Sequence, residues 1–185
     1  MSKSGYHGIR QQDLKFVTYK LYQLIILLFL LFTFLGCSQS DDQREFEREA
    51  FAEPNGFTET ADNGSIVEGR EDPDDWRVAP FYQGLIDIFP PYPNPILTNQ
   101  RLTFELSVTG IDAVNGLRVH VFRNLSTLSQ PLYQEFQRPL PPGLLSISLN
   151  PLDIAEIREN PQGLYRIIVL DPQGNVITYG DIQIE

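Results

Sequence analysis

The sequence contains few of the residues on which most enzymes and metalloproteins depend. It has one cysteine, Cys37, and two histidines, His7 and His120. A single thiol cannot form an intrachain disulfide, and a structural zinc site needs several cysteine or histidine ligands. The sequence also contains no P-loop, no dinucleotide fingerprint and no nucleophile-elbow motif. We therefore expect neither an enzyme nor a bound metal or other cofactor.

Lysine is scarce as well, and the lysines are confined to one end of the chain. All three lysines lie within residues 1–20, whereas residues 38–75 hold thirteen acidic residues and only three arginines. Residues 76–185 are nearly balanced, with ten acidic residues and seven arginines. This asymmetry predicts a basic targeting end, an acidic arm and a globular part. Because the formal net charge of -10 would repel phosphate backbones, we expect no nucleic-acid partner.

The one long hydrophobic run, residues 24–35, is too short to cross a bilayer. Its twelve residues would form a helix of roughly 18 Å, against a hydrocarbon core of about 30 Å. Lys15 and Lys20 precede the run, and a basic stretch followed by a short apolar one is typical of a secretory signal peptide. We expect residues 1–36 to be such a peptide and to be cleaved. The alternative is an uncleaved signal anchor.

The cysteine stands at the end of this run, in Leu35-Gly36-Cys37. The segment resembles the lipobox of bacterial lipoproteins, although Phe34 and Leu35 depart from the residues most common at those positions. The resemblance implies that Cys37 is acylated and becomes the mature N-terminus, and acyl chains of this kind anchor a protein almost permanently.

The residues after the cysteine carry a second resemblance. Ser40, Asp41 and Asp42 look like the export signal that directs lipoproteins of the Bacteroidota to the outer leaflet of the outer membrane. The resemblance implies an outer-membrane protein that faces the cell surface, with a periplasm-facing anchor as the alternative. In either case the membrane, reached through acyl chains on Cys37, is one partner.

Residues 37–75 have the composition of a flexible tether. Aliphatic residues are few and acidic residues many, so this stretch is not expected to bury enough surface to offset its conformational entropy. As a coil it would span on the order of 35 Å. Residues 44–51 could form two helical turns with Phe46, Ala50 and Phe51 on one face and Glu45 paired with Arg48, either as a motif that docks on a partner or as part of the tether. The run of acids from Asp72 to Asp75 lacks the spacing of a calcium loop and is interpreted as a solvated acidic stretch.

From Trp76 onward apolar and polar residues alternate with period two, and turn signals recur about every ten residues. A short helix is expected after Asn150, which can cap it, with Pro151 at its first position. Seven strands within about 110 residues indicate an all-β fold, a single antiparallel β-sandwich spanning residues 76–185. The predicted strands are residues 85–89, 101–108, 117–123, 132–136, 145–149, 163–170 and 176–184.

Several short motifs within residues 86–185 resemble one family. They are Tyr92-Pro93-Asn94-Pro95, residues 102–106, residues 119–122, and the Gly163-Leu164-Tyr165 strand followed by a turn at Gly174. Together they resemble the FlgD-type immunoglobulin-like domain and the related C-terminal sorting domain of type IX secretion cargo. The resemblance implies an immunoglobulin-like sandwich. Sorting domains follow a large passenger and end near a basic residue. This sequence has no such passenger before residue 76 and ends in an acidic residue, so we expect a free-standing module, with a cargo-like protein as the alternative.

The proline-rich motif has a structural interpretation. Each proline fixes φ and removes a donor, and Pro95 holds Asn94 extended. We expect Tyr92, Pro93, Asn94 and Pro95 to form a rigid crossover between the two sheets.

The expected function is that of a lipid-anchored binding or scaffold protein of the cell envelope, a non-catalytic accessory subunit whose second partner is another envelope protein. A surface carbohydrate-binding or adhesion domain is an alternative, with Trp76 as the sugar platform because it is the only tryptophan. A spacer without a ligand of its own is another. The candidate partner contacts are Phe46, Phe51, Trp76, Phe81 and Tyr82.

Overall fold

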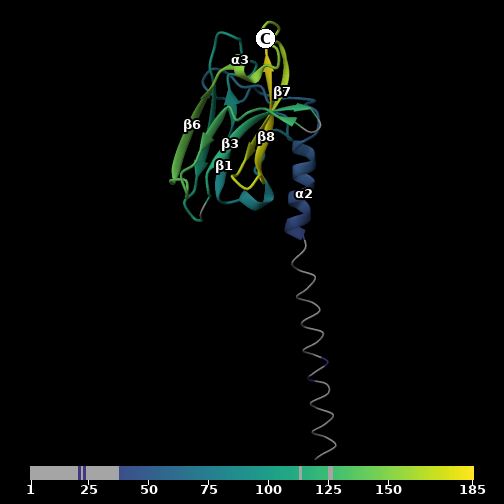
Figure 1. Ribbon diagram of the computed structural model, residues 1–185, viewed down its shortest axis with the longest axis vertical. Helices are drawn as coiled ribbons and strands as arrows, with labels where there is room; N and C mark the ends of the chain where they lie inside the picture. The colour runs from purple at the N-terminus through teal and green to yellow at the C-terminus, as the bar shows by residue number, and fades with distance from the viewer. Residues whose placement is uncertain (1–20, 22, 24–37, 113, 125–126) are drawn as a thin grey trace, which may run out of the picture. The chain divides into compact units, whose positions relative to one another are not determined.

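The computed structural model describes residues 21, 23, 38–112, 114–124 and 127–185 (Figure 1). The expected signal peptide and Cys37 lie outside these residues. The chain divides into two compact units, residues 1–41 and 42–185, and the second holds the sandwich. None of the helices in the described part of the chain is long and apolar enough to span a membrane.

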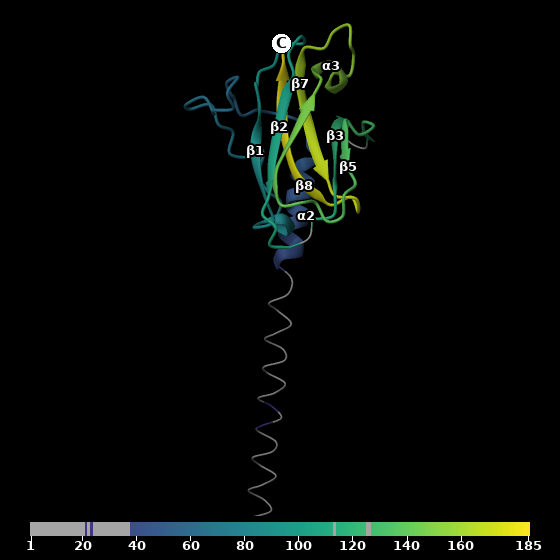
Figure 2. The same ribbon diagram turned by 90° about the vertical axis from the view of Figure 1, so that its left-hand side faces the viewer.

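Two antiparallel sheets make up the second unit. The first has the order β1-β2-β6, and the second has the order β4-β3-β7-β8, with β5 also paired to β3 (Figure 2). The seven predicted strands are all present, and β4 is an eighth that the sequence did not indicate. The strands are β1 (Ile86–Tyr92), β2 (Leu102–Val108), β3 (Leu117–Asn124), β4 (Thr127–Leu128), β5 (Tyr133–Glu135), β6 (Gly143–Leu149), β7 (Gly163–Leu170) and β8 (Val176–Ile184).

The strand order is that of an immunoglobulin-like sandwich. In chain order the first sheet corresponds to strands A, B and E of that fold, and the second to C′, C, F and G. The burial of β2 alternates strictly, so that Leu102, Phe104 and Leu106 point into the core between the sheets. The prediction of an all-β, immunoglobulin-like antiparallel sandwich is confirmed.

The second sheet is buried on both faces. Consecutive residues Ile167 to Leu170 of β7 are all buried, as are seven consecutive residues at the start of β8. One face packs on the first sheet, and the other lies under helix α2 (Ser38–Ala50). Phe46 of α2 packs on Tyr179 of β8 with ring centroids 5.0 Å apart. The helix therefore forms a third layer that covers the outer face of β7 and β8.

The expectation of a flexible tether is wrong for residues 42–75. Within α2, Gln43, Phe46 and Ala50 are buried, and further on Thr58 and Thr60 are buried as well. The composition of this stretch did not reveal that its few apolar residues fall where the sheet has an uncovered apolar face. The folded unit consequently begins at residue 42 instead of 76.

Helix α2 has the buried face that its sequence predicted. Phe46 and Ala50 lie on a common buried face as the spacing predicted, and Arg48 pairs with Glu45. The alternative of a motif that docks on a partner through this face is wrong, because Phe46 and Ala50 are buried against the chain's own sheet. Phe51, just past the helix, is 37% exposed and packs edge-on against Phe122 of β3.

Residues 76–79 protect the outer edge of β8. The backbone N–H of Trp76 donates to the carbonyl of Tyr179 over 2.9 Å, and that of Ala79 donates to the carbonyl of Ile177 over 2.9 Å. At the far end of the strand, Ile96 pairs with Ile184 in parallel. A strand edge that is paired in this way cannot add further chains.

The segment from Tyr92 to Pro95 passes from the first sheet to the second. Tyr92 ends β1, and Ile96 already pairs with β8. Between them the fully buried Asn94 donates from its side-chain amide to the carbonyls of Thr58 and Asp181, each over 3.0 Å. Its amide oxygen accepts from the backbone N–H of Gln183 over 2.9 Å. This crossover is therefore also a junction between β8 and residues 42–75, which we call the N-terminal segment.

Candidate functional site

Three of the five candidate partner contacts are buried in the domain. Phe46, Trp76 and Tyr82 are each less than 10% exposed, whereas Phe51 and Phe81 are 37% and 42% exposed. The prediction that Phe46, Trp76 and Tyr82 contact a partner is therefore wrong. Aromatic residues at a domain entrance are commonly part of the core, and here they close the sandwich under α2 and residues 76–82.

Trp76 cannot act as a sugar platform. Its indole lies 5.4 Å from the Phe104 ring and covers Gly180, where a Cβ atom would come within 2.2 Å of the indole. Its backbone has φ of 56°, which is unusual for a residue with a side chain. The residue serves the core, and the alternative of a carbohydrate site built on Trp76 loses its main residue.

The export-signal residues lie at the beginning of the described part. Asp41 and Asp42 are exposed, and nothing is described of the Ser40 side chain. Gly163 and Tyr165 lie at the start of β7, where the Tyr165 hydroxyl donates to the carbonyl of Pro161 over 3.0 Å. Gly174, with φ of 94°, occupies the turn between β7 and β8.

That turn is organised by Asp171. Its Oδ1 accepts from the backbone N–H groups of Gln173 and Asn175, each over 2.8 Å, and its Oδ2 accepts from the Tyr82 hydroxyl over 2.7 Å. Burial of Asp171 favours the protonated form, but these hydrogen bonds outweigh it and lower the pKa of the carboxyl. The turn is therefore held rigidly against η1 (Pro80–Tyr82).

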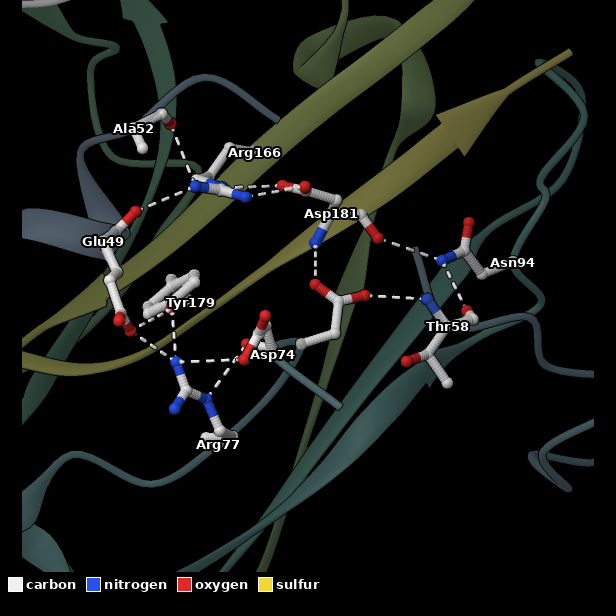
Figure 3. A network of polar contacts seen from close by, with 10 residues as sticks. Glu49, Ala52, Thr58, Asp74, Arg77, Asn94, Arg166, Tyr179 and Asp181 are labelled. Atoms are coloured by element: carbon white, nitrogen blue, oxygen red, sulfur yellow. Dashed lines mark hydrogen bonds and ion pairs between the residues drawn. The ribbon is translucent and has the colours of Figure 1, made fainter. Parts of the chain in front are cut away.

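A cluster of buried charges joins α2 to the sheet (Figure 3). Arg166 of β7 donates from Nε to Asp181 Oδ1 over 2.7 Å and from Nη2 to Asp181 Oδ2 over 2.8 Å. Its Nη1 donates to the carbonyls of Glu49 and Ala52, each over 2.9 Å. Because those carbonyls belong to the C-terminal end of α2, the guanidinium caps the helix where its dipole is negative.

Asp75 extends this cluster into the N-terminal segment. Its Oδ1 accepts from the backbone N–H of Asp181 and its Oδ2 from that of Thr58, both over 2.8 Å. Burial raises the pKa of Asp75 to about 7, although these two donors partly offset the effect. The acidic run from Asp72 to Asp75, expected to be solvated, thus supplies one partly buried acceptor.

Every partner in this charged cluster belongs to the chain itself. Arg77, for example, donates to Glu49 Oε2 over 2.6 Å and to the Tyr179 hydroxyl over 2.8 Å. Within the described residues no group of three or more His, Cys, Asp or Glu side chains is placed to hold a metal ion. The cluster fastens the N-terminal segment to the sandwich, and we assign it a structural role.

An open groove of about 740 Å³ lies on another side of the molecule. It lies beside β6 and β4, the strands at the ends of the two sheets. Helix α3 (Pro151–Ile154) and residues 155–159 form its third side. The lining residues are Arg101, Arg123, Ser129, Gln130, Pro131, Leu132, Ser148, Leu149, Asn150, Leu152, Asp153, Ala155, Glu156, Ile157, Arg158 and Glu159.

The polar residues of the groove are fixed by contacts within the chain. Arg123 donates from Nη1 to the carbonyl of Ile154 over 2.9 Å, and Arg158 donates from Nη2 to Asp153 Oδ1 over 2.5 Å. The Ile157 side chain is 55% exposed at the groove. An extended peptide suits such a lining, because β6 ends its sheet and can offer backbone groups to an added strand.

Sequence reasoning missed this groove. Glu156 and Glu159 both line it, although no motif singled them out. No local signal marks the groove, because its walls come from four separate segments between residues 101 and 159.

Comparisons with known proteins show no family for this chain. No protein-family model matches the chain, and no curated protein matches it either. Among solved structures, a CARDB domain of the PF1109 protein from Pyrococcus furiosus, in complex with di-metal ions, is similar at 19% identity. The similarity covers 54% of this chain and 84% of that domain, with a TM-score of 0.30. We draw nothing about the site from so distant a likeness; the strand order itself defines an immunoglobulin-like β-sandwich protein.

Proposed function

We propose that this protein is a lipid-anchored, non-catalytic binding module of the bacterial cell envelope. The observation that carries the proposal is the position of the lone thiol. Cys37 follows the apolar run of residues 24–35 after one small residue, Gly36, and stands five residues before Asp42, where the folded unit begins. A cysteine at that junction is suited to acylation and to cleavage of the preceding segment.

The finer assignment rests on sequence resemblance. Leu35-Gly36-Cys37 resembles a lipobox, and Ser40-Asp41-Asp42 resembles the export signal of Bacteroidota lipoproteins. We extend the proposal to the outer membrane, with the domain facing the cell surface. The sandwich itself we liken to FlgD-type immunoglobulin-like domains, on the motifs from Tyr92 to Gly174.

The groove beside β6 and α3 supports a binding role. It combines three arginines and three acidic residues with an exposed isoleucine, Ile157, at the end of a sheet. We propose that it receives an extended segment of another envelope protein, which pairs with β6 and covers Ile157. Mixed charge of this kind gives orientation and specificity to a peptide partner.

Anchoring can be tested on intact cells that express the full chain. The wild-type protein should enter the membrane fraction and partition into detergent, and added protease should remove the domain from whole cells if it faces outward. The control is Cys37→Ser, which keeps the apolar run but cannot be acylated. Because the variant keeps its apolar run and can itself enter detergent, acyl chains on the wild-type protein are the deciding readout, and a wild-type protein without the added mass of acyl chains would contradict lipid anchoring.

Partner binding can be tested separately by affinity capture from detergent-solubilised envelopes. Ile157→Asp places a charge in the groove, and Ile66→Asp is the matched control, because Ile66 is 40% exposed outside the groove lining. We expect a protein that is captured by the wild type and by Ile66→Asp and is lost with Ile157→Asp. An identical set of captured proteins for all three chains would contradict the groove as the binding site.

A further inference from the structure

The part of helix α2 that belongs to the second unit begins at one end of the sandwich. Gln43 donates from Nε2 to the carbonyl of Val176, the first residue of β8, over 3.2 Å, and its Oε1 accepts from the backbone N–H of Phe81 over 3.2 Å. Gln43 is also 2% exposed, so these contacts are buried. The first turn of the folded unit is therefore fixed between η1 and the turn that precedes β8.

Strand pairing brings further segments to this end. Val108, the last residue of β2, pairs with Ile86 at the start of β1 and with Gly143 at the start of β6. Leu117 at the start of β3 pairs with Glu135 at the end of β5. We call this end of the sandwich the proximal end, and it comprises residues 80–84, 109–112, 114–117, 135–144 and 171–176. Figure 1 shows the turn between β7 and β8 at the same end as the beginning of α2.

Large apolar side chains are exposed on several of these segments. Phe81 is 42% exposed, Ile111 80%, Phe136 61% and Leu144 62%. They come from three different segments of the chain, so their exposure at one end is not the property of a single loop. Isolated exposed apolar residues need no explanation, but a group at one end of a domain suggests a surface that is covered by a partner.

Chain length identifies the covering surface. Five peptide units separate Cys37 from Asp42, so their Cα atoms lie at most about 18 Å apart. The nine residues of β8 span about 30 Å from the proximal end to the opposite end. An acyl anchor on Cys37 thus keeps the proximal end at the membrane, on a connection about half the length of the 35 Å coil that the composition suggested.

We propose that the proximal end docks on the lipid surface that holds the anchor, with Phe81, Ile111, Phe136 and Leu144 at the boundary between headgroups and acyl chains. This inference rests on the proposed lipidation of Cys37. Interfacial binding of this kind scales with the apolar area that is buried. Because acidic residues such as Asp42 and Asp112 also lie at this end, apolar contact drives the docking, and added salt should leave it unchanged.

Spin labels can measure this docking in the acylated protein. With Cys37 blocked by acylation, an introduced cysteine is the one reactive thiol, and both Gln137 and Asn99 are exposed positions that leave the four apolar residues intact. Gln137→Cys reports on the proximal end, and Asn99→Cys, which follows exposed Leu97 beyond the crossover, reports on the opposite end. In phosphatidylcholine vesicles we expect the label at 137 to be relaxed more by lipid-soluble oxygen than by a water-soluble nickel complex, and the label at 99 to show the reverse.

A set of substitutions tests whether the apolar side chains cause the docking. Phe81→Ser, Ile111→Ser, Phe136→Ser and Leu144→Ser are combined in one chain, and the matched control combines Ile66→Ser, Leu97→Ser and Phe89→Ser, which are exposed apolar positions outside the proximal end. Urea unfolding of both chains verifies that they fold. In the chain with the four proximal substitutions, the label at 137 should become accessible to the nickel complex although the protein still floats with vesicles. In the control chain, the label at 137 should stay shielded from the nickel complex.

The outcomes separate this inference from the proposed function. If the wild-type protein floats with vesicles but both labels are equally accessible to nickel, the anchor stands and the docking is wrong. If the wild-type protein carries no acyl chain and does not float, both proposals are wrong.

Discussion

Arg166 and Asp181 form a bidentate ion pair with side chains that are 7% and 1% exposed, and the same guanidinium caps the C-terminal end of α2. One arginine therefore connects β7, β8 and the N-terminal segment. A charge pair so deeply buried adds little net stability compared with apolar residues, but removing one partner leaves the other charge buried and unpaired.

Arg166→Met should therefore destabilise the domain strongly. We expect a loss of about 3–5 kcal/mol in the free energy of unfolding, measured by urea denaturation. Backbone amides of residues 42–52 should also exchange hydrogen faster, because α2 loses its cap. The control is Arg158→Met, which removes an exposed pair with Asp153 and should cost less than about 1 kcal/mol. Similar losses for the two variants would contradict the role assigned to Arg166.

The raised pKa of Asp75 predicts a dependence of stability on pH. Its pKa is about 7 in the folded protein and near 3.8 in the unfolded chain, so between these values the folded state binds more protons. The contribution of Asp75 is fully present below about pH 4 and is lost as pH rises through 7. For this single group the change cannot exceed about 1.4 kcal/mol per pH unit.

Urea unfolding at pH 5 and pH 8 tests this. The wild-type protein should lose more stability between the two values than Asp75→Asn does. Asp74→Asn, which changes an exposed neighbour, should behave as the wild type does. If the free energy of unfolding of the wild-type protein instead rose from pH 5 to pH 8 relative to that of Asp75→Asn, the prediction would be contradicted.

Gly180 and Trp76 are expected to be coupled. In Gly180→Ala the new Cβ would meet indole atoms at 2.2–2.5 Å, so the ring must leave its position on Phe104. We expect a loss of about 1–3 kcal/mol and a red shift of the fluorescence of the single tryptophan. In the double variant Trp76→Phe with Gly180→Ala, the smaller ring should relieve the clash, so the combined loss is smaller than the sum of the two. Strict additivity would show that the contact is absent.

Asn94 should tolerate no change in its hydrogen-bonding groups. In Asn94→Asp an acceptor replaces the amide donor that faces the carbonyls of Thr58 and Asp181. Leaving such buried groups unpaired costs about 1–3 kcal/mol, and repulsion between oxygens adds to this. Asn99→Asp, at an exposed position, should change the midpoint of thermal unfolding little. Equal midpoints for both variants would contradict the junction described for Asn94.

The strands could be predicted from the sequence because their evidence is local. In β2 the alternation of Leu102 and Phe104 with polar neighbours records one buried face, and the limits of β7 and β8 agree with those predicted. The two-residue β4 was missed because a strand this short has no period to detect. Glycine and proline signals gave the turns for the same local reason.

The third layer, formed by α2, could not be predicted from neighbouring residues alone, because it depends on residues that are far apart in the sequence. The run Ile167 to Leu170 was interpreted as a central strand, but four consecutive buried residues also require a cover on the outer face of the sheet. The only amphipathic helix in the acidic stretch, with Phe46 and Ala50 on one side, is that cover. Charge composition led to the opposite expectation, because acids such as Asp75 act as hydrogen-bond acceptors here and not as solvated tether residues.

The central claim, a folded binding module held to a lipid bilayer by residue 37, is tested most directly by the mass of the N-terminal peptide of the protein purified from membranes. The account predicts that this peptide begins at Cys37 and carries the added mass of acyl chains. A peptide that retains residues 1–36, or that begins at Cys37 with a free thiol, would contradict it.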